Sequence, residues 1–65
     1  MDKEKAIQTI IKNHSDRLTR LKARYERKYY NATTSEEILR VNEWLEKEEE
    51  KVQREYLKEL KGVML

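Results

Sequence analysis

Three consecutive residues of this chain carry the side-chain types of a hydrolytic triad: His14, Ser15 and Asp16. On a helix, consecutive side chains point about 100° apart, so these three groups diverge and cannot act on one atom. A single histidine and no cysteine are too few for a histidine-rich or thiolate metal site. The sequence also contains no glycine-rich phosphate loop. We therefore expect no catalytic residue, no metal and no cofactor, and a protein that is not an enzyme.

The residues best suited to bind a ligand are four arginines at intervals of three or four residues: Arg17, Arg20, Arg24 and Arg27. This spacing forms one ridge on a helix, which we expect on the side away from the core. A guanidinium group offers a planar fork of donors that matches phosphate. Tyr25, Tyr29 and Tyr30 near the end of the ridge are able to stack on exposed bases. One interpretation is therefore a nucleic-acid-binding regulator.

The distribution of charge supports a different interpretation. Residues 1–32 carry nine Lys or Arg and four Asp or Glu, and residues 33–65 carry six and nine. In an antiparallel hairpin, residues 16–28 lie beside residues 37–49, so the basic run adjoins the acidic one. The asymmetry then sets the register between two helices, with each exposed pair contributing less than about 1 kcal/mol. An acidic protein partner is a third alternative.

Two helices are predicted on either side of a single cluster of small turn-forming residues. We expect the first helix over residues 3–30, a turn at 31–35 and the second helix over 36–61. Together they form one all-α domain of residues 1–65. Residues 13–16 include Asn, Ser and Asp, which are poor mid-helix residues, so a break or kink at that point stays open.

Three sequence features predict how these helices begin and end. Asn31 suits a left-handed cap at the end of the first helix. Thr34 followed by Glu37 forms a capping box for the second helix, and the same pattern occurs one residue earlier. Gly62 stands where a glycine commonly terminates a helix.

Apolar residues at helical spacing predict which side of each helix faces the other. In the first helix this stripe runs from Ile7 to Tyr29, and in the second from Ile38 to Leu60. The short turn makes the two helices antiparallel, so residue i is expected opposite residue 65 − i. The predicted fold is therefore a helical hairpin.

The seam between the helices contains an expected polar contact. His14, the one histidine, lies on the first stripe, and Glu48 and Glu49 interrupt the second. The register places His14 near Lys51, within one turn of both glutamates. Three interpretations stay open: a histidine–glutamate pair that fixes the register, a pH-sensitive pair, or a histidine at a loosely packed point of the seam.

A hairpin of this length buries little apolar surface, so each helix needs more than one neighbour. Three apolar residues lie on the flanks of the second stripe: Leu39, Trp44 and Leu57. We expect them to form an interface with a second copy, which completes a four-helix bundle, or with another helical protein. Trp44 is the expected anchor, because tryptophan is enriched at interfaces. The alternatives for Trp44 are an exposed aromatic residue without a partner and a wide edge of the core between the two helices.

The composition of the 65 residues excludes several classes of protein. There is no cysteine, so no disulfide framework can form. No apolar run is long enough to span a membrane, and the first residues lead into no apolar signal segment. We expect a cytoplasmic protein without a membrane partner. The function that we favour is a small non-enzymatic protein–protein interaction or regulatory module, such as a phage or plasmid accessory protein, with the nucleic-acid-binding regulator as the alternative.

Overall fold

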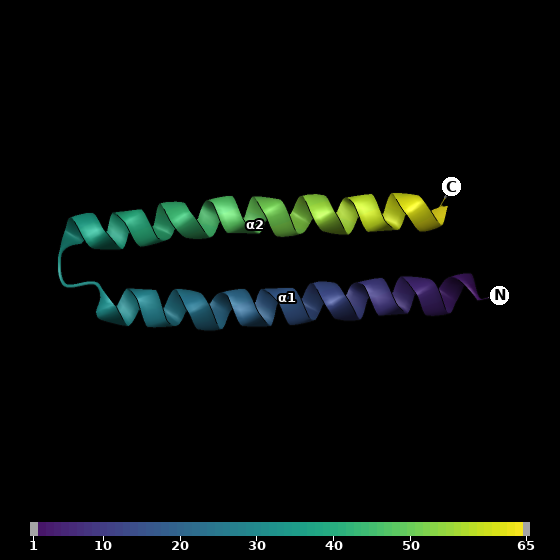
Figure 1. The fold of residues 1–65 in the computed structure, drawn as a ribbon, viewed down its shortest axis with the longest axis horizontal. Coiled ribbons are helices and arrows are strands. Elements are labelled where there is room, and N and C mark those ends of the chain that lie inside the picture. Colours follow the sequence, from purple (N-terminus) through teal and green to yellow (C-terminus); the bar gives the residue numbers. More distant parts are fainter. Residues whose placement is uncertain (1, 65) are drawn as a thin grey trace.

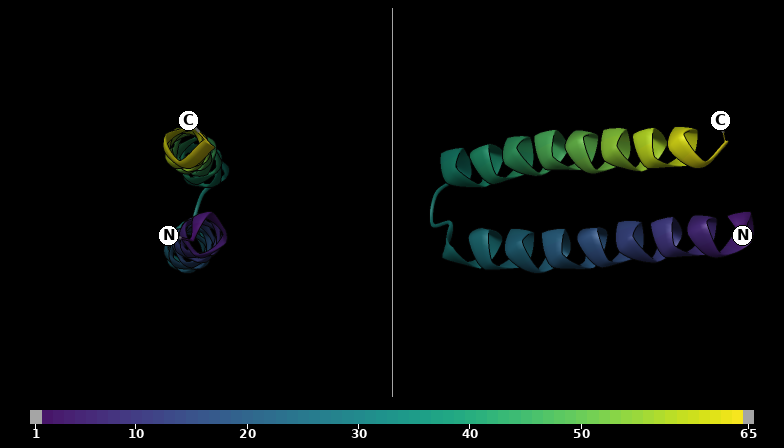
Figure 2. Two further views of the ribbon diagram at one scale, coloured as in Figure 1. Left: turned by 90° about the vertical axis from the view of Figure 1, so that its right-hand side faces the viewer. Right: turned by 45° about the vertical axis from the view of Figure 1, so that its right-hand side comes forward.

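The computed structural model describes residues 2–64, which form two long helices. Helix α1 spans Lys3–Asn31 and helix α2 spans Ser35–Met64. The helices lie side by side and antiparallel, with both termini at the same end (Figure 1). The Cα atoms extend over 52 × 17 × 7 Å with a radius of gyration of 15.3 Å, against about 11 Å for a compact chain of this length. Figure 2 shows the same single layer from the end. The predicted helical hairpin is confirmed.

Helix α1 runs without a break through residues 13–16. Within this stretch, the Thr19 hydroxyl donates a hydrogen bond to the Ser15 carbonyl oxygen at 3.0 Å. This bond joins a residue to the carbonyl one turn earlier and leaves the helical ladder in place. His14 also packs on α2 through its ring, which adds tertiary support at the same point. Packing therefore outweighs the low helix propensity of these residues.

The turn between the helices consists of residues 32–34, and a capping box starts α2. The Thr34 hydroxyl accepts a hydrogen bond from the Glu37 backbone N–H at 3.1 Å. In return, the Glu37 carboxylate accepts a hydrogen bond from the Thr33 backbone N–H at 3.0 Å. The carboxylate thus reaches one residue further back than in the usual capping box, where it bonds the N-cap N–H. The box predicted from Thr34 and Glu37 is present.

The two other cap predictions are wrong. Asn31 is the last helical residue of α1, and Ala32 follows it in an extended conformation with φ −74° and ψ 129°. Gly62 does not end α2, which continues to Met64. No residue from 2 to 64, Gly62 included, has a positive φ. The additional helical residues extend the contact with α1, because Val63 is half-buried.

The core of the hairpin is a single row of side chains. Within residues 2–64, the buried apolar residues are Ile10 and Leu21, at 9% and 6% exposure. Both come from α1. Half-buried apolar residues of α2 lie along the same seam: Ile38, Val41, Leu45, Val52, Leu60 and Val63.

The backbone register agrees with the predicted one, since Lys28 borders the same hollow as Glu37 and Arg17 the same hollow as Glu48, but individual side-chain partners differ. His14 stacks on Tyr56, with ring centroids 4.0 Å apart, instead of lying opposite Lys51. The Tyr25 hydroxyl donates a hydrogen bond to Oδ1 of Asn42 at 2.9 Å, two residues beyond the expected position. The cause is the tilt of helical side chains toward the N-terminus of their own helix. In antiparallel helices this tilt is opposite on the two sides, so each α1 residue contacts a residue further along α2.

The capping box predicts a measurable contribution to stability. Replacing Thr34 with Ala removes the acceptor for the Glu37 N–H, and we expect the free energy of unfolding to fall by about 1 kcal/mol. Urea denaturation followed by circular dichroism measures this change. Thr33→Ala is the matched control, because Thr33 contributes a backbone N–H that the substitution retains. Equal losses for both variants would contradict the assignment of Thr34 as the cap.

Candidate interaction surfaces

The contacts across the seam divide the hairpin into two faces. At about 100° per residue, Arg17 and Arg24 lie on one side of the direction of Leu21, and Tyr25 lies on the other. Arg17 and Arg24 contact α2 on their side through ionic and cation–π contacts. Tyr25 contacts Asn42 on the opposite side. We call the side of Tyr25 the apolar face and the side of Arg24 the basic face.

The apolar face holds most of the large apolar side chains that remain exposed. Helical geometry places six of the seven exposed large hydrophobic residues of the described chain on this face. They are Ile11, Leu18 and Tyr29 on α1, at 40–48% exposure, and Leu39, Leu57 and Met64 on α2, at 50–62%. The seventh, Tyr30, is 83% exposed and points away from the seam. Leu57, Leu60 and Met64 also line a shallow hollow at the open end.

The three residues predicted as one interface do not share a surface. Leu39 and Leu57 lie on the apolar face, and because they are 18 residues apart, they point in the same direction from α2. Trp44 lies on the basic face and is half-buried. Its ring is covered by Arg24 and Lys28 of α1, with Cζ and Nζ at 5.0 Å and 4.9 Å from the ring centroid. Trp44 is therefore part of the contact between the two helices.

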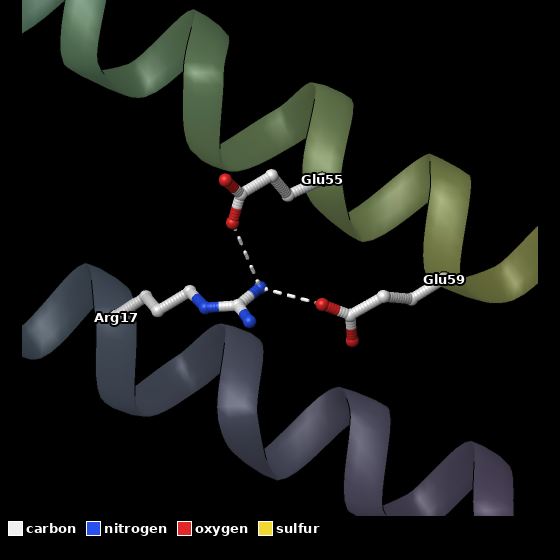
Figure 3. A network of polar contacts seen from close by, with 3 residues as sticks. All are labelled: Arg17, Glu55 and Glu59. Atoms are coloured by element: carbon white, nitrogen blue, oxygen red, sulfur yellow. Dashed lines mark ion pairs between the residues drawn. The ribbon is translucent and has the colours of Figure 1, made fainter.

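The predicted arginine ridge is also divided. Arg17 turns toward α2, where its Nη1 lies 2.9 Å from Oε1 of Glu59 and 3.5 Å from Oε2 of Glu55 (Figure 3). Arg24 covers Trp44. These two arginines therefore hold the helices together, whereas Arg20 and Arg27 are exposed on the basic face.

The expected pair between His14 and a seam glutamate is not formed. The imidazole of His14 stacks on the Tyr56 ring at an interplanar angle of 19°, and its Nδ1 is buried without a hydrogen-bond partner. Glu48 lies 4.0 Å from Lys51 of its own helix. Glu49 borders the same surface groove as His14 on the apolar face. The opposite tilt of the side chains on the two helices explains the difference, because it brings the Tyr56 ring against His14 in place of the glutamates.

The basic face includes cations of α2 that sequence reasoning missed. Arg40 and Lys47 are seven residues apart and so point in nearly the same direction from α2. Arg40 and Lys28 line one hollow beside the turn. The spacing of these two residues is visible in the sequence, but the side of the seam on which they lie depends on the tertiary contacts.

Neither a metal cluster nor a membrane span is found in the described part of the chain. Between residues 2 and 64, no three His, Asp or Glu side chains are grouped closely enough to hold a metal ion. Neither α1 nor α2 contains a stretch long and apolar enough to cross a bilayer. Comparison of the chain with protein-family models, curated proteins and solved structures found no match.

The ion pairs of Arg17 predict that reversing its charge destabilises the hairpin, and that exchanging the charges of Arg17 and Glu59 restores part of the stability. Arg17→Glu removes the contact with Glu59 and adds repulsion, so we expect the free energy of unfolding to fall by about 1–2 kcal/mol. The double variant Arg17→Glu with Glu59→Arg should recover at least half of this loss. Arg20→Glu is the matched control and should change stability by less than about 0.5 kcal/mol. A double variant no more stable than Arg17→Glu alone would contradict the assignment.

The unpartnered nitrogen of His14 predicts a stabilising substitution. His14→Phe keeps an aromatic ring against Tyr56 and removes the buried polar atom, so we expect the free energy of unfolding to rise by about 1 kcal/mol. His14→Ala, which removes the stack as well, should lower it. Thermal unfolding of both variants measures these changes. A phenylalanine variant less stable than the wild type would show that Nδ1 has a partner in solution.

Proposed function

We propose that this chain is a non-enzymatic interaction module whose hairpin associates with a second copy through the apolar face, which completes a four-helix bundle. The observation that carries this proposal is the sidedness of the exposed apolar residues. Isolated exposed hydrophobic residues are ordinary on protein surfaces, but residues gathered on one face are typical of an interaction site. Here six large apolar side chains share one face of a molecule with a single-row core.

The large accessible surface of the hairpin supports association with a second copy. The chain exposes 5645 Å², whereas a folded monomer of its mass exposes about 4,450 Å². The excess of about 1,200 Å² is comparable with the surface that one partner buries in a standard interface, about 800 Å². Covering the apolar face with a second hairpin would bring the exposed surface per chain into the usual range.

The charges on the apolar face favour a second copy in one orientation. Lys22 of α1 and Glu49 of α2 border the same groove halfway along this face. If α1 of one copy packs on α2 of the other, with both turns at the same end, Lys22 lies opposite Glu49 of the second copy. If α2 instead packs antiparallel on α2, Glu46, Glu49 and Glu50 meet the same residues of the second copy, and like charges repel. The face is therefore complementary to itself in the first arrangement.

Sedimentation equilibrium tests this proposal over a range of protein concentrations. We expect a mass twice that of the 8.0 kDa chain, and a melting temperature that rises with concentration. Leu57→Lys places a charge within the apolar face and should shift the protein toward the monomer. Tyr30→Lys is the matched control, because Tyr30 is even more exposed but points away from this face.

Two outcomes would contradict the proposal. One is a monomer whose melting temperature is independent of concentration, which would leave the apolar face to a different helical protein. The other is equal weakening of the dimer by Leu57→Lys and Tyr30→Lys, which would place the interface elsewhere.

A further inference from the structure

The half of the basic face next to the turn carries a dense group of cations. Helical geometry places seven of them there: Arg20, Arg24, Arg27 and Lys28 on α1, and Arg40, Lys47 and Lys51 on α2. Two carboxylates, Glu37 and Glu48, lie on the same half, and Glu36 and Glu43 border it one turn from Arg40 and Lys47. Glu37 accepts a hydrogen bond from the Thr33 N–H, and Glu48 lies 4.0 Å from Lys51. The patch, which we call the turn-end basic patch, therefore carries more cations than carboxylates.

Charges on the other half of the basic face are balanced. There Arg17 lies beside Glu55 and Glu59, which neutralise it. The excess of cations over carboxylates on this face is thus greatest near the turn. A ligand attracted to it meets cations from both helices, since Lys28 and Arg40 lie beside one hollow.

Trp44 holds two of these cations in place. Arg24 and Lys28 are four residues apart on α1, and both lie on the ring of Trp44 of α2. Cation–π contacts of this kind fix the long side chains while their charged ends stay accessible. Because these side chains are already ordered, binding costs less conformational entropy.

The chemistry of the patch favours a nucleic acid over an acidic protein. Protein interfaces depend on aromatic or aliphatic anchors at their centre. On this patch the indole is covered by cations, and the large exposed apolar residues of the described chain lie elsewhere, apart from Tyr30 at the edge. Four of the seven cations are arginines, whose planar forks match phosphate oxygens. Tyr30, 83% exposed and three residues after Arg27, meets the Tyr29 ring edge-to-face with centroids 6.4 Å apart, and its exposed surface is available to stack on an unpaired base.

We propose that the turn-end basic patch binds single-stranded nucleic acid, with Arg20, Arg24, Arg27 and Arg40 contacting phosphates and Tyr30 stacking on a base. The patch lies on the face opposite to the apolar face, so binding does not depend on self-association. Each copy of the chain carries one complete site.

Fluorescence anisotropy with a labelled 20-nucleotide single-stranded RNA tests this site. With four to five phosphate contacts, the logarithm of the binding constant should fall with the logarithm of salt with a slope of about −3. Binding should then weaken about 60-fold between 50 mM and 200 mM salt. Arg20→Gln with Arg27→Gln should reduce affinity about tenfold at 50 mM salt and make the slope shallower by about 1 to 1.5. Tyr30→Ala should reduce affinity about fivefold without changing the slope.

The matched control removes the same amount of charge outside the patch. Lys5→Gln with Lys61→Gln changes two exposed cations at the open end and should leave affinity within about twofold. Circular dichroism confirms that each variant is folded. Absence of binding at 50 mM salt, or equal losses for the patch and control variants, would overturn the proposal. Competition by poly-glutamate as strong as by RNA at equal charge would assign the patch to an acidic protein instead.

Discussion

The seam between α1 and α2 is only one row of side chains wide, and the rest of the molecule depends on this narrow contact. Ile10 and Leu21 are the buried apolar residues of the described chain. Six other large apolar side chains of the described chain remain exposed on one side of the seam. Folding therefore leaves an uncovered hydrophobic surface, and a second hairpin placed on it would supply the burial that one hairpin lacks. Association through this surface would then add directly to folding stability.

The same seam separates two kinds of chemistry. Apolar side chains lie on the side of Tyr25 and Asn42, and cations gather on the side of Arg24 and Trp44. Because the two surfaces are on opposite faces, association through one leaves the other accessible. A bundle of two hairpins would carry a basic patch on each outer surface. The polar contacts across the seam, from Arg17 to Glu59 and from Tyr25 to Asn42, determine which residues belong to which face.

The hairpin could be predicted from the sequence because its signals are local. Helix-forming stretches flank one turn, and the hydrogen bonds that Glu37 makes with Thr34 and Thr33 join residues three and four apart. The division into faces could not be predicted in the same way. A rotation of α1 by roughly 40° about its own axis moves the centre of the face that contacts α2 from one side chain to its neighbour on the helix surface. That small rotation turns Arg17 and Arg24 toward α2.

The partners of seam residues also depend on how the two helices pack, and not on local sequence signals alone. The opposite tilt of side chains on antiparallel helices shifted the contact of His14 from the region of Lys51 to Tyr56. Trp44 was expected beside Leu39 and Leu57 because all three lie outside the stripe. Helical spacing does not say which flank meets the arginines, so only the packed structure separates Trp44 from the other two.

An isotope-filtered NOE experiment on a mixture of ¹³C-labelled and unlabelled protein tests the self-associating face most directly. We expect intermolecular contacts to the methyl groups of Leu39, Leu57 and other apolar-face residues. Intermolecular contacts confined to Trp44 and its arginines, or none at all, would show that the hairpin does not associate through this face.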